Sequence, residues 1–351
     1  MAGANSYTAA GNLVTGLPPV IVPDLSAGKL VLPNSLGTTT FPQDTRRGYI
    51  ESYNFTLQRD MGQGINVQAG YVGTLSIRQF ANVNINASTP NGGNAGEPLD
   101  ILWGNASTIS LITPFNSARY NSLQSTAVKR FRGSSSVRMA YTWSRAIDYN
   151  DNSDSGLTWN WVPMLQRNKA LSGYDRTHNL KIYGTYDLPF GRGQRWFTQG
   201  FVNKIIGGWQ INGIMSLVSG TPFTVASSGT ALNSPGATQT ANQILANVQI
   251  FGGLTPYFDP KAFSAPTGAG VFGNTGRDIL RGPGYFNLDS SVFRNFRITE
   301  RFRLQFRAEA FGTTNTPHFA NPAATVSSGG FGNITSSSGQ RQLRFAMKVT
   351  Y

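Results

Sequence analysis

The last ten residues of the chain alternate strictly between two kinds of side chain. Every second residue is apolar, and the residues between are polar, charged or small. Successive side chains of a β-strand point to opposite faces, so this segment predicts a strand with one apolar and one charged face. The apolar positions are Leu343, Phe345, Met347, Val349 and Tyr351, and the alternate positions are Gln342, Arg344, Ala346, Lys348 and Thr350.

The same alternation recurs upstream and predicts a chain built mainly of strands. Together these runs predict about nine strands, each near the ~9–11 residues that a tilted strand needs to cross a bilayer. We therefore predict an all-β fold, a segment of an antiparallel transmembrane β-barrel. The clear upstream runs cover residues 65–78, 137–144, 179–188, 209–217 and 301–310, and weaker runs cover 49–59, 119–131 and 287–296.

The connections between these strands separate a barrel from a soluble sandwich, whose strands also alternate. Long segments (79–118, 146–177, 220–285 and 313–339) take turns with shorter ones (61–64, 132–135, 189–208 and 297–300). Outer-membrane barrels have long extracellular loops and short periplasmic turns, whereas compact soluble domains rarely carry several long structureless loops. The pattern places Asp151, Trp159 and Asn233 outside the cell, and Gly62, Gly133 and Thr299 in the periplasm.

Composition narrows the functional classes further. The chain has no Cys, which excludes disulfides and thiolate chemistry, and only 13% of its residues are charged. The net charge of +13 is spread through the strands rather than clustered, so we expect no nucleic-acid partner and instead contact with outer-membrane lipid and lipopolysaccharide. Residues 1–7 lack the features of a signal peptide, and no window approaches the ~20 apolar residues of a membrane helix.

Six sequence stretches resemble the C-terminal barrel of TonB-dependent outer-membrane receptors, in particular the Oar-like branch, whose members carry an N-terminal carboxypeptidase-regulatory-like domain. The resemblance implies outer-membrane transport of a bulky solute, by uptake or export, and no enzymatic activity. The stretches are Ala140–Asp148, Tyr174–Leu180, Tyr186–Gly193, Gly207–Gly213, Leu304–Phe311 and Arg341–Lys348.

The resemblance also predicts what accompanies this segment. A family barrel has about 22 strands, so nine form its final portion (residues 46–351), with residues 1–45 as the remnant of an extracellular loop. We expect the signal peptide, the regulatory-like domain, the plug and the earlier strands to be missing from the chain, and contact with TonB to run only through the missing part. The C-terminal residues Phe345, Met347, Val349 and Tyr351 are similar to the signal that barrel-assembly machinery recognises.

Few side chains suggest chemistry, and we predict no catalytic, cofactor or metal site. Asp148, Asp151 and Asp154 offer oxygen ligands for Ca²⁺, but their spacing does not match an EF-hand, which favours a solvated loop. A charged side chain facing lipid costs ~2–4 kcal/mol at the midplane, so we assign the charged strand faces to the lumen. These faces either line the solute path or seat the plug, or they only stabilise the wall by cross-strand pairing. The lumen candidates are Arg301, Arg303, Arg307, Glu309, Arg344 and Lys348.

Three tryptophans in the long segments keep a second function open. Trp103, Trp159 and Trp161 fall between the predicted strands, and exposed aromatic rings suit stacking on sugars. The alternative is therefore a surface-exposed or secreted β-protein that binds glycans or partners through its loops. No sequence feature identifies a transported substrate.

Overall fold

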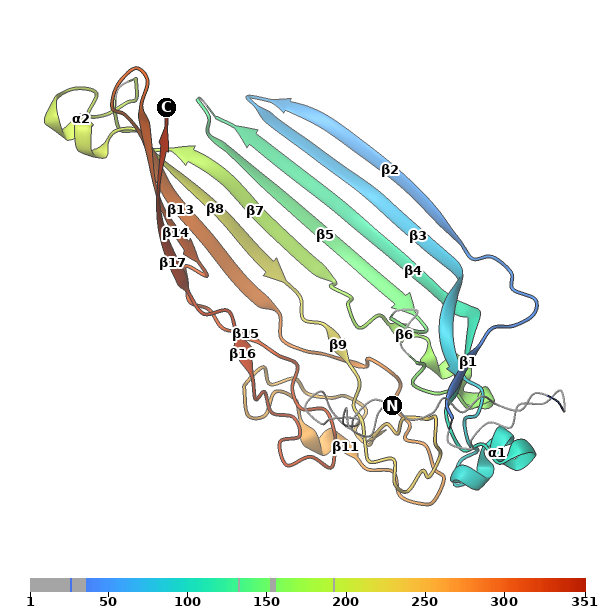
Figure 1. The fold of residues 1–351 in the computed structure, drawn as a ribbon. Helices are drawn as coiled ribbons and strands as arrows, with labels where there is room; N and C mark the ends of the chain where they lie inside the picture. Colours follow the sequence, from blue (N-terminus) through green and yellow to red (C-terminus); the bar gives the residue numbers. More distant parts are fainter. Residues whose placement is uncertain (1–25, 27–35, 132, 152–155, 192) are drawn as a thin grey trace, which may run out of the picture.

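One large antiparallel sheet dominates the computed structural model, which describes residues 26, 36–131, 133–151, 156–191 and 193–351 (Figure 1). Each of its nine long strands pairs with the next one along the chain, in the order β2-β3-β4-β5-β7-β8-β13-β14-β17. The predicted strand number and antiparallel meander are confirmed. The strands are β2 (Tyr49–Gly62), β3 (Ile65–Asn84), β4 (Ile109–Arg130), β5 (Ser136–Asp148), β7 (His178–Asp187), β8 (Trp209–Val218), β13 (Tyr285–Arg297), β14 (Arg303–Phe311) and β17 (Gln342–Thr350).

Two very short strands extend the sheet away from this main path. β1 (Thr38–Thr40) pairs in parallel with the first residues of β4, and β6 (Ala170–Leu171) pairs with the last residues of β5. Within the described residues, β2 and β17 each pair with a long strand on one side only. The sheet is therefore open at these two edges.

The strand register places the apolar positions of neighbouring strands side by side. One row of directly opposed residues crosses seven strands, from Leu57 on β2 to Phe286 on β13, and all but Ser125 are apolar. Alternation within each strand and register between strands thus combine into one continuous apolar face. The row consists of Leu57, Ala69, Ser125, Tyr141, Leu180, Leu217 and Phe286.

Charged residues frame this apolar face above and below. On β4 the face lies between Arg119 and Lys129, and on β2 between Glu51 and Arg59. Ten residues at ~3.4 Å each, tilted by ~45°, span about 24 Å, near the ~25 Å of an outer-membrane apolar band. Lys129 directs its ammonium group out of the band, to the carbonyl of Gln63 in the neighbouring turn (2.6 Å). The face has the dimensions of a lipid-facing surface.

Short and long connections lie at opposite ends of the sheet, as predicted (Figure 1). The short-turn end carries residues 63–64, 131–135 and 298–302, the medium connection 188–208 and the C-terminus. The long connections (85–108, 149–177, 219–284 and 312–341) gather at the other end. Two short helices, α1 (Pro98–Trp103) and α2 (Gly200–Ile206), interrupt the connections and were not predicted. Among the described residues, no helix has the length and apolar character needed to cross a membrane.

The four long connections pack together into a folded unit, here called the cap. Its apolar core centres on Phe258, which is fully buried and contacts the rings of Phe223, Phe263 and Phe331 at centroid distances of 5.3–6.0 Å. The long connections are therefore packed against one another, because residues from two of them share one core. The cap also contains β9 (Pro222–Phe223), β10 (Asn242–Gln243), β11 (Phe263–Ser264), β12 (Leu280–Arg281), β15 (His318–Phe319) and β16 (Ser337–Ser338).

Candidate functional site

The polar face of the sheet is continuous across seven strands. One row of directly opposed residues contains only polar or charged side chains, and the amide of Asn212 donates to the hydroxyl of Ser291 (3.2 Å). Placing so many polar groups in hydrocarbon would cost several kcal/mol each. This face therefore belongs to the water-filled side of a barrel wall. The row consists of Arg130, Ser136, Thr185, Asn212, Ser291, Glu309 and Arg344.

Five of the six predicted lumen residues lie on this polar face. Arg303, Arg307 and Glu309 project from β14, and Arg344 and Lys348 project from β17. Glu309 lies directly opposite Arg344, and Lys348 lies opposite Gln305. Opposite charges on facing strands favour the pairing, so this register is compatible with the wall-stabilising role, which stays a prediction beside that of lining the solute path.

Arg301 lies outside the wall. It is part of the turn 298–302 between β13 and β14, where its backbone N–H donates to the hydroxyl of Thr299 (3.3 Å). The alternating sequence pattern begins two residues before β14 itself begins at Arg303, so the prediction for Arg301 needs this correction. Arg301 therefore lies in the turn and not on the strand to which the sequence assigned it.

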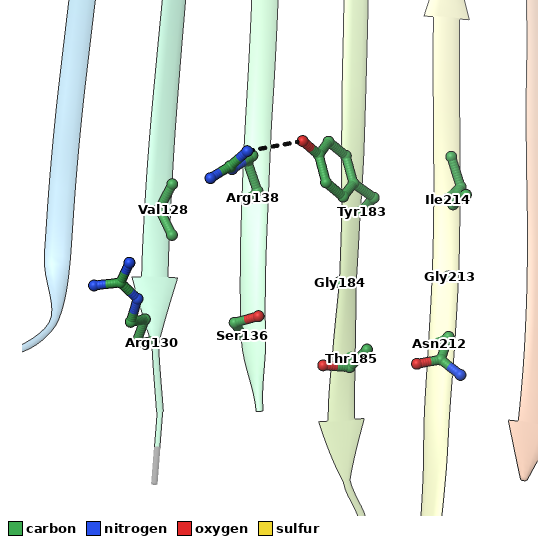
Figure 2. Close-up of a pocket in the computed structure, with 10 residues that line it drawn as sticks. All are labelled: Val128, Arg130, Ser136, Arg138, Tyr183, Gly184, Thr185, Asn212, Gly213 and Ile214. Carbon is green, nitrogen blue, oxygen red and sulfur yellow. Dashed lines mark hydrogen bonds between the residues drawn. The ribbon is translucent and has the colours of Figure 1, made fainter. Parts of the chain in front are cut away.

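A depression of about 500 Å³ opens on the polar face where β4, β5, β7 and β8 meet (Figure 2). Arg130, Arg138 and Tyr183 give it a basic and aromatic lining, and we call it the basic notch. The guanidinium of Arg138 donates to the hydroxyl of Tyr183 (3.3 Å), as the dashed line in Figure 2 shows. Gly184 and Gly213 lie side by side on neighbouring strands and contribute their backbone to its lining. The notch offers positive charge beside an aromatic ring, a combination that binds anions.

Sequence reasoning missed the basic notch because its residues come from four strands. Each strand contributes only two or three of them, and the strand register brings Arg130 and Arg138 together. Basic residues outnumber acidic ones over the whole polar face. The basic residues are Arg130, Arg138, Lys181, Arg297, Arg303, Arg307, Arg344 and Lys348, and the acidic ones are Asp60, Asp148, Asp187, Asp289 and Glu309.

A buried ion cluster ties the cap to the adjoining end of the sheet. Arg277, only 8% exposed, contacts the carboxylate of Asp148 at the end of β5 and that of Asp151 (3.3 Å). It also lies 3.7 Å from the carboxylate of Asp278, and its Nε donates to the carbonyl of Asn168 (3.1 Å). Burial raises the pKa of Asp278, and the charge of Arg277 opposes that rise.

The cluster corrects the prediction of a solvated acidic loop. Asp148 is 1% exposed and Asp151 39% exposed, and both share the charge of Arg277; Asp154 lies outside the described residues. Over the part of the chain that the structure describes, no three His, Cys, Asp or Glu side chains are placed to hold a metal ion. The acidic residues act as partners of an arginine.

A second ion pair fixes the start of β7. The guanidinium of Arg281 donates to the carboxylate of Asp175 (2.6 Å), whose other oxygen accepts from the backbone N–H of Ala146 (2.7 Å). Asp175 lies in one of the stretches that carry the resemblance described above. Through these contacts, Asp175 joins the connection 149–177 to the end of β5 and to the connection 219–284. This part of the stretch therefore has a structural role.

The three tryptophans of the long connections have different surroundings. Trp103 is 73% exposed at the end of α1, next to the exposed side chains of Ile101 and Leu102. Trp161 is half-buried and stacks on Phe272 with centroids 6.1 Å apart. Trp159 is fully buried, and the guanidinium of Arg167 lies 4.6 Å from the centroid of its ring. Trp159 therefore belongs to the packed cap and presents no surface for a ligand.

The C-terminal residues proposed for assembly lie where the alternation predicts. Phe345 and Met347 are each 72% exposed on the apolar face of β17, Val349 follows at 58%, and Tyr351 ends the chain at 86%. Trp209, at the short-turn end, packs edge-on against Phe306 of the same face, with centroids 6.0 Å apart. Large exposed apolar side chains on one face only are typical of a surface that meets lipid.

Comparison with known proteins agrees with this geometry. The family model for the outer membrane beta barrel domain matches residues 2–344. The structure of the outer membrane transporter YddB from Escherichia coli superposes with a TM-score of 0.52 at 8% identity, over 91% of this chain and 34% of that chain. The ferripyoverdine receptor of the outer membrane of Pseudomonas aeruginosa gives a TM-score of 0.39 at 11% identity, over 86% of this chain and 27% of that chain. A search of curated proteins finds no match.

The likeness to YddB is one of fold alone, and the chain spans about a third of the length of that protein. The family match covers most of the sequence and agrees with the nine-stranded meander, its two-faced register and its long and short ends. The protein is located in the outer membrane, and the chain belongs to the family of outer-membrane β-barrel domains.

Proposed function

We propose that this chain forms part of the wall, and the extracellular cap, of a TonB-dependent transport receptor of the Oar-like branch. The observation that carries the proposal is the pairing of a continuous polar face with an apolar face about 24 Å high. A wall with these two faces encloses water within a membrane. The receptor imports or exports a bulky solute through that enclosed path.

The open edges support a wider barrel than nine strands form. In lipid, unpaired backbone groups cost several kcal/mol each, so the outer edges of β2 and β17 need partner strands. An odd number of strands closing on itself would place one parallel pair at the seam. We propose that further strands complete a barrel of about 22, and that a plug fills its lumen. TonB would act on the receptor through parts other than this wall.

The basic surplus of the polar face favours contact with acidic groups on the solute or on the plug. The basic notch is one place for such contact, because Arg130, Arg138 and the hydroxyl of Tyr183 line the same depression. The wall needs to bind, orient and release, and it needs no reacting group. We accordingly propose that the chain is not an enzyme and that the assembly machinery reads Phe345 and Tyr351.

Transport is tested by genetics in the native host. A deletion strain is compared with its parent during growth on single limiting nutrients, alongside a strain without TonB and a strain without both. We expect the deletion to impair growth on a subset of the conditions that also require TonB, with no further loss in the double mutant. A growth defect that adds to the loss of TonB would contradict the proposal.

A second function, glycan binding by the cap, has one specific observation in its favour. Ile101, Leu102 and Trp103 are 65–73% exposed at the tip of α1, on the extracellular side. The test is binding of intact cells to immobilised polysaccharides with and without Trp103→Ala. Phe251→Ala, at an exposed aromatic residue elsewhere in the cap, is the matched control. Equal binding by parent and Trp103→Ala cells would remove this function.

A further inference from the structure

The medium connection between β7 and β8 differs from the other periplasmic turns. It spans residues 188–208, contains α2, and carries three basic residues and no acidic one. Five of its large apolar side chains are 47–74% exposed, the most exposed being Phe201 at the start of α2. Ile205 lies four positions after Phe201 and three after Val202, so it neighbours both of them on the helix surface. The remaining two are Trp196 and Phe197.

The C-terminal end of α2 is held on the lipid side of the wall. The carbonyl of Ile205, which has no partner within the helix, accepts hydrogen bonds from Nε1 of Trp209 (3.0 Å) and from the guanidinium of Arg294 (2.6 Å). Both side chains belong to the apolar face, where Arg294 also lies over the ring of Phe296 (4.4 Å). The exposed apolar face of α2 is therefore continuous with the lipid-facing surface of the sheet.

A helix of seven residues is unstable by itself in water, and α2 leaves its apolar face uncovered. Its basic residue Lys204 is exposed, as is Arg195, whose guanidinium lies 5.3 Å from the ring of Trp196. Helices that lie in a membrane interface combine these features: an apolar face 5–10 Å deep in the head-group region, and basic residues that attract anionic lipid.

We propose that residues 195–206 form an interfacial anchor that inserts into the periplasmic leaflet of the outer membrane and binds anionic phospholipid head groups. Phe201, Val202 and Ile205 enter the acyl boundary, while Arg195 and Lys204 contact phosphates. The anchor fixes the depth and tilt of the wall next to β8. The inference follows from the position of α2 on the lipid face and does not depend on what the barrel transports.

The test places a fluorophore on the anchor in the reconstituted protein. Single Cys variants at Phe201, Glu300 and Met347 carry an environment-sensitive nitrobenzoxadiazole, in vesicles of phosphatidylethanolamine and phosphatidylglycerol. Glu300 is a fully exposed residue of another periplasmic turn, and Met347 is a reference on the lipid-facing surface. We expect emission from position 201 to be blue-shifted relative to 300, and quenched more by shallow than by deep spin-labelled lipid, with the reverse order at 347.

Charge dependence provides the second measurement. Replacing phosphatidylglycerol by phosphatidylcholine, or combining Arg195→Gln with Lys204→Gln, is expected to reduce the blue shift at 201 and to leave that at 347 unchanged. A fluorophore at 201 as water-exposed as the one at 300 would overturn the proposal. So would a blue shift that appears only when periplasmic extract is added, because that result assigns the surface to a protein partner.

Discussion

The sheet and the cap are stabilised in opposite ways. Phe345 and Met347 in the sheet are each 72% exposed, whereas Phe258 in the cap is fully buried. The sheet is held by pairing between strands, and its apolar side chains face a solvent that is itself apolar. The cap faces water and is held, like a soluble domain, by an apolar core and by buried ion pairs. One chain therefore follows two different packing rules on the two sides of the membrane surface.

Arg277→Ala is expected to produce the largest difference in stability between the cap and the sheet. The substitution leaves the carboxylate of Asp148 buried without its partner, which typically costs about 3–5 kcal/mol. We expect faster hydrogen exchange at cap amides such as Ala241 and Tyr257, and unchanged exchange at Leu180 in the sheet. Exchange measured by mass spectrometry on the membrane-embedded protein resolves the two regions.

Arg297→Ala is the control for this experiment. Arg297 pairs with Glu300 in an exposed turn at 3.8 Å, and exposed pairs contribute little to stability. Exchange in the cap and in the sheet should both stay at the parent level. Equal acceleration of cap and sheet by Arg277→Ala would contradict the view that the two regions are stabilised separately.

The next effect in size concerns the two faces of β17. Phe345→Arg places a charge on the lipid-facing surface at a cost of ~2–4 kcal/mol near the midplane, whereas Ala346→Arg faces the lumen. Ala346 lies directly opposite Arg307, so the second guanidinium itself costs up to ~1 kcal/mol. We expect a net difference of about 2 kcal/mol, seen as a lower yield of assembled protein in the outer membrane for Phe345→Arg. Equal yields would reject the assigned faces.

The smallest predicted effect is a pH dependence confined to the cap. Burial raises the pKa of Asp278 in the folded cap above its ordinary value near 4. Between the ordinary pKa and the raised pKa, the folded cap binds more protons than the unfolded cap. Ionisation of Asp278 therefore lowers the stability of the cap as the pH rises from the first value to the second. After correction for the pH dependence of intrinsic exchange, cap amides should be better protected at pH 5 than at neutral pH. Asp278→Asn should remove that difference in protection. A pH effect of the same size in Asp278→Asn would assign it to another group.

The contrast also explains what the sequence reveals. Alternation is local, so strands such as β8 and β17, and the polar side of Arg307 and Arg344, follow directly from neighbouring residues. The cap has no period: Phe258 meets Phe331, and Arg277 meets Asp148, across more than 70 residues of chain. No local pattern distinguishes the buried Trp159 from the exposed Trp103. Strand register is less local than alternation but more local than the contacts of the cap. The basic notch therefore becomes visible only when neighbouring strands are paired.

The most direct test of the account is the side of the membrane that each end of the sheet occupies. This chain has no Cys, so single Cys substitutions at Val162 in the cap (76% exposed) and at Glu300 in the periplasmic turn each add one thiol, and the parent protein is the labelling control. In the protein as its host makes it, a membrane-impermeant maleimide should label position 162 on intact cells. It should label position 300 only after the outer membrane is permeabilised. Labelling of position 300 but not of position 162 on intact cells would contradict the central claim.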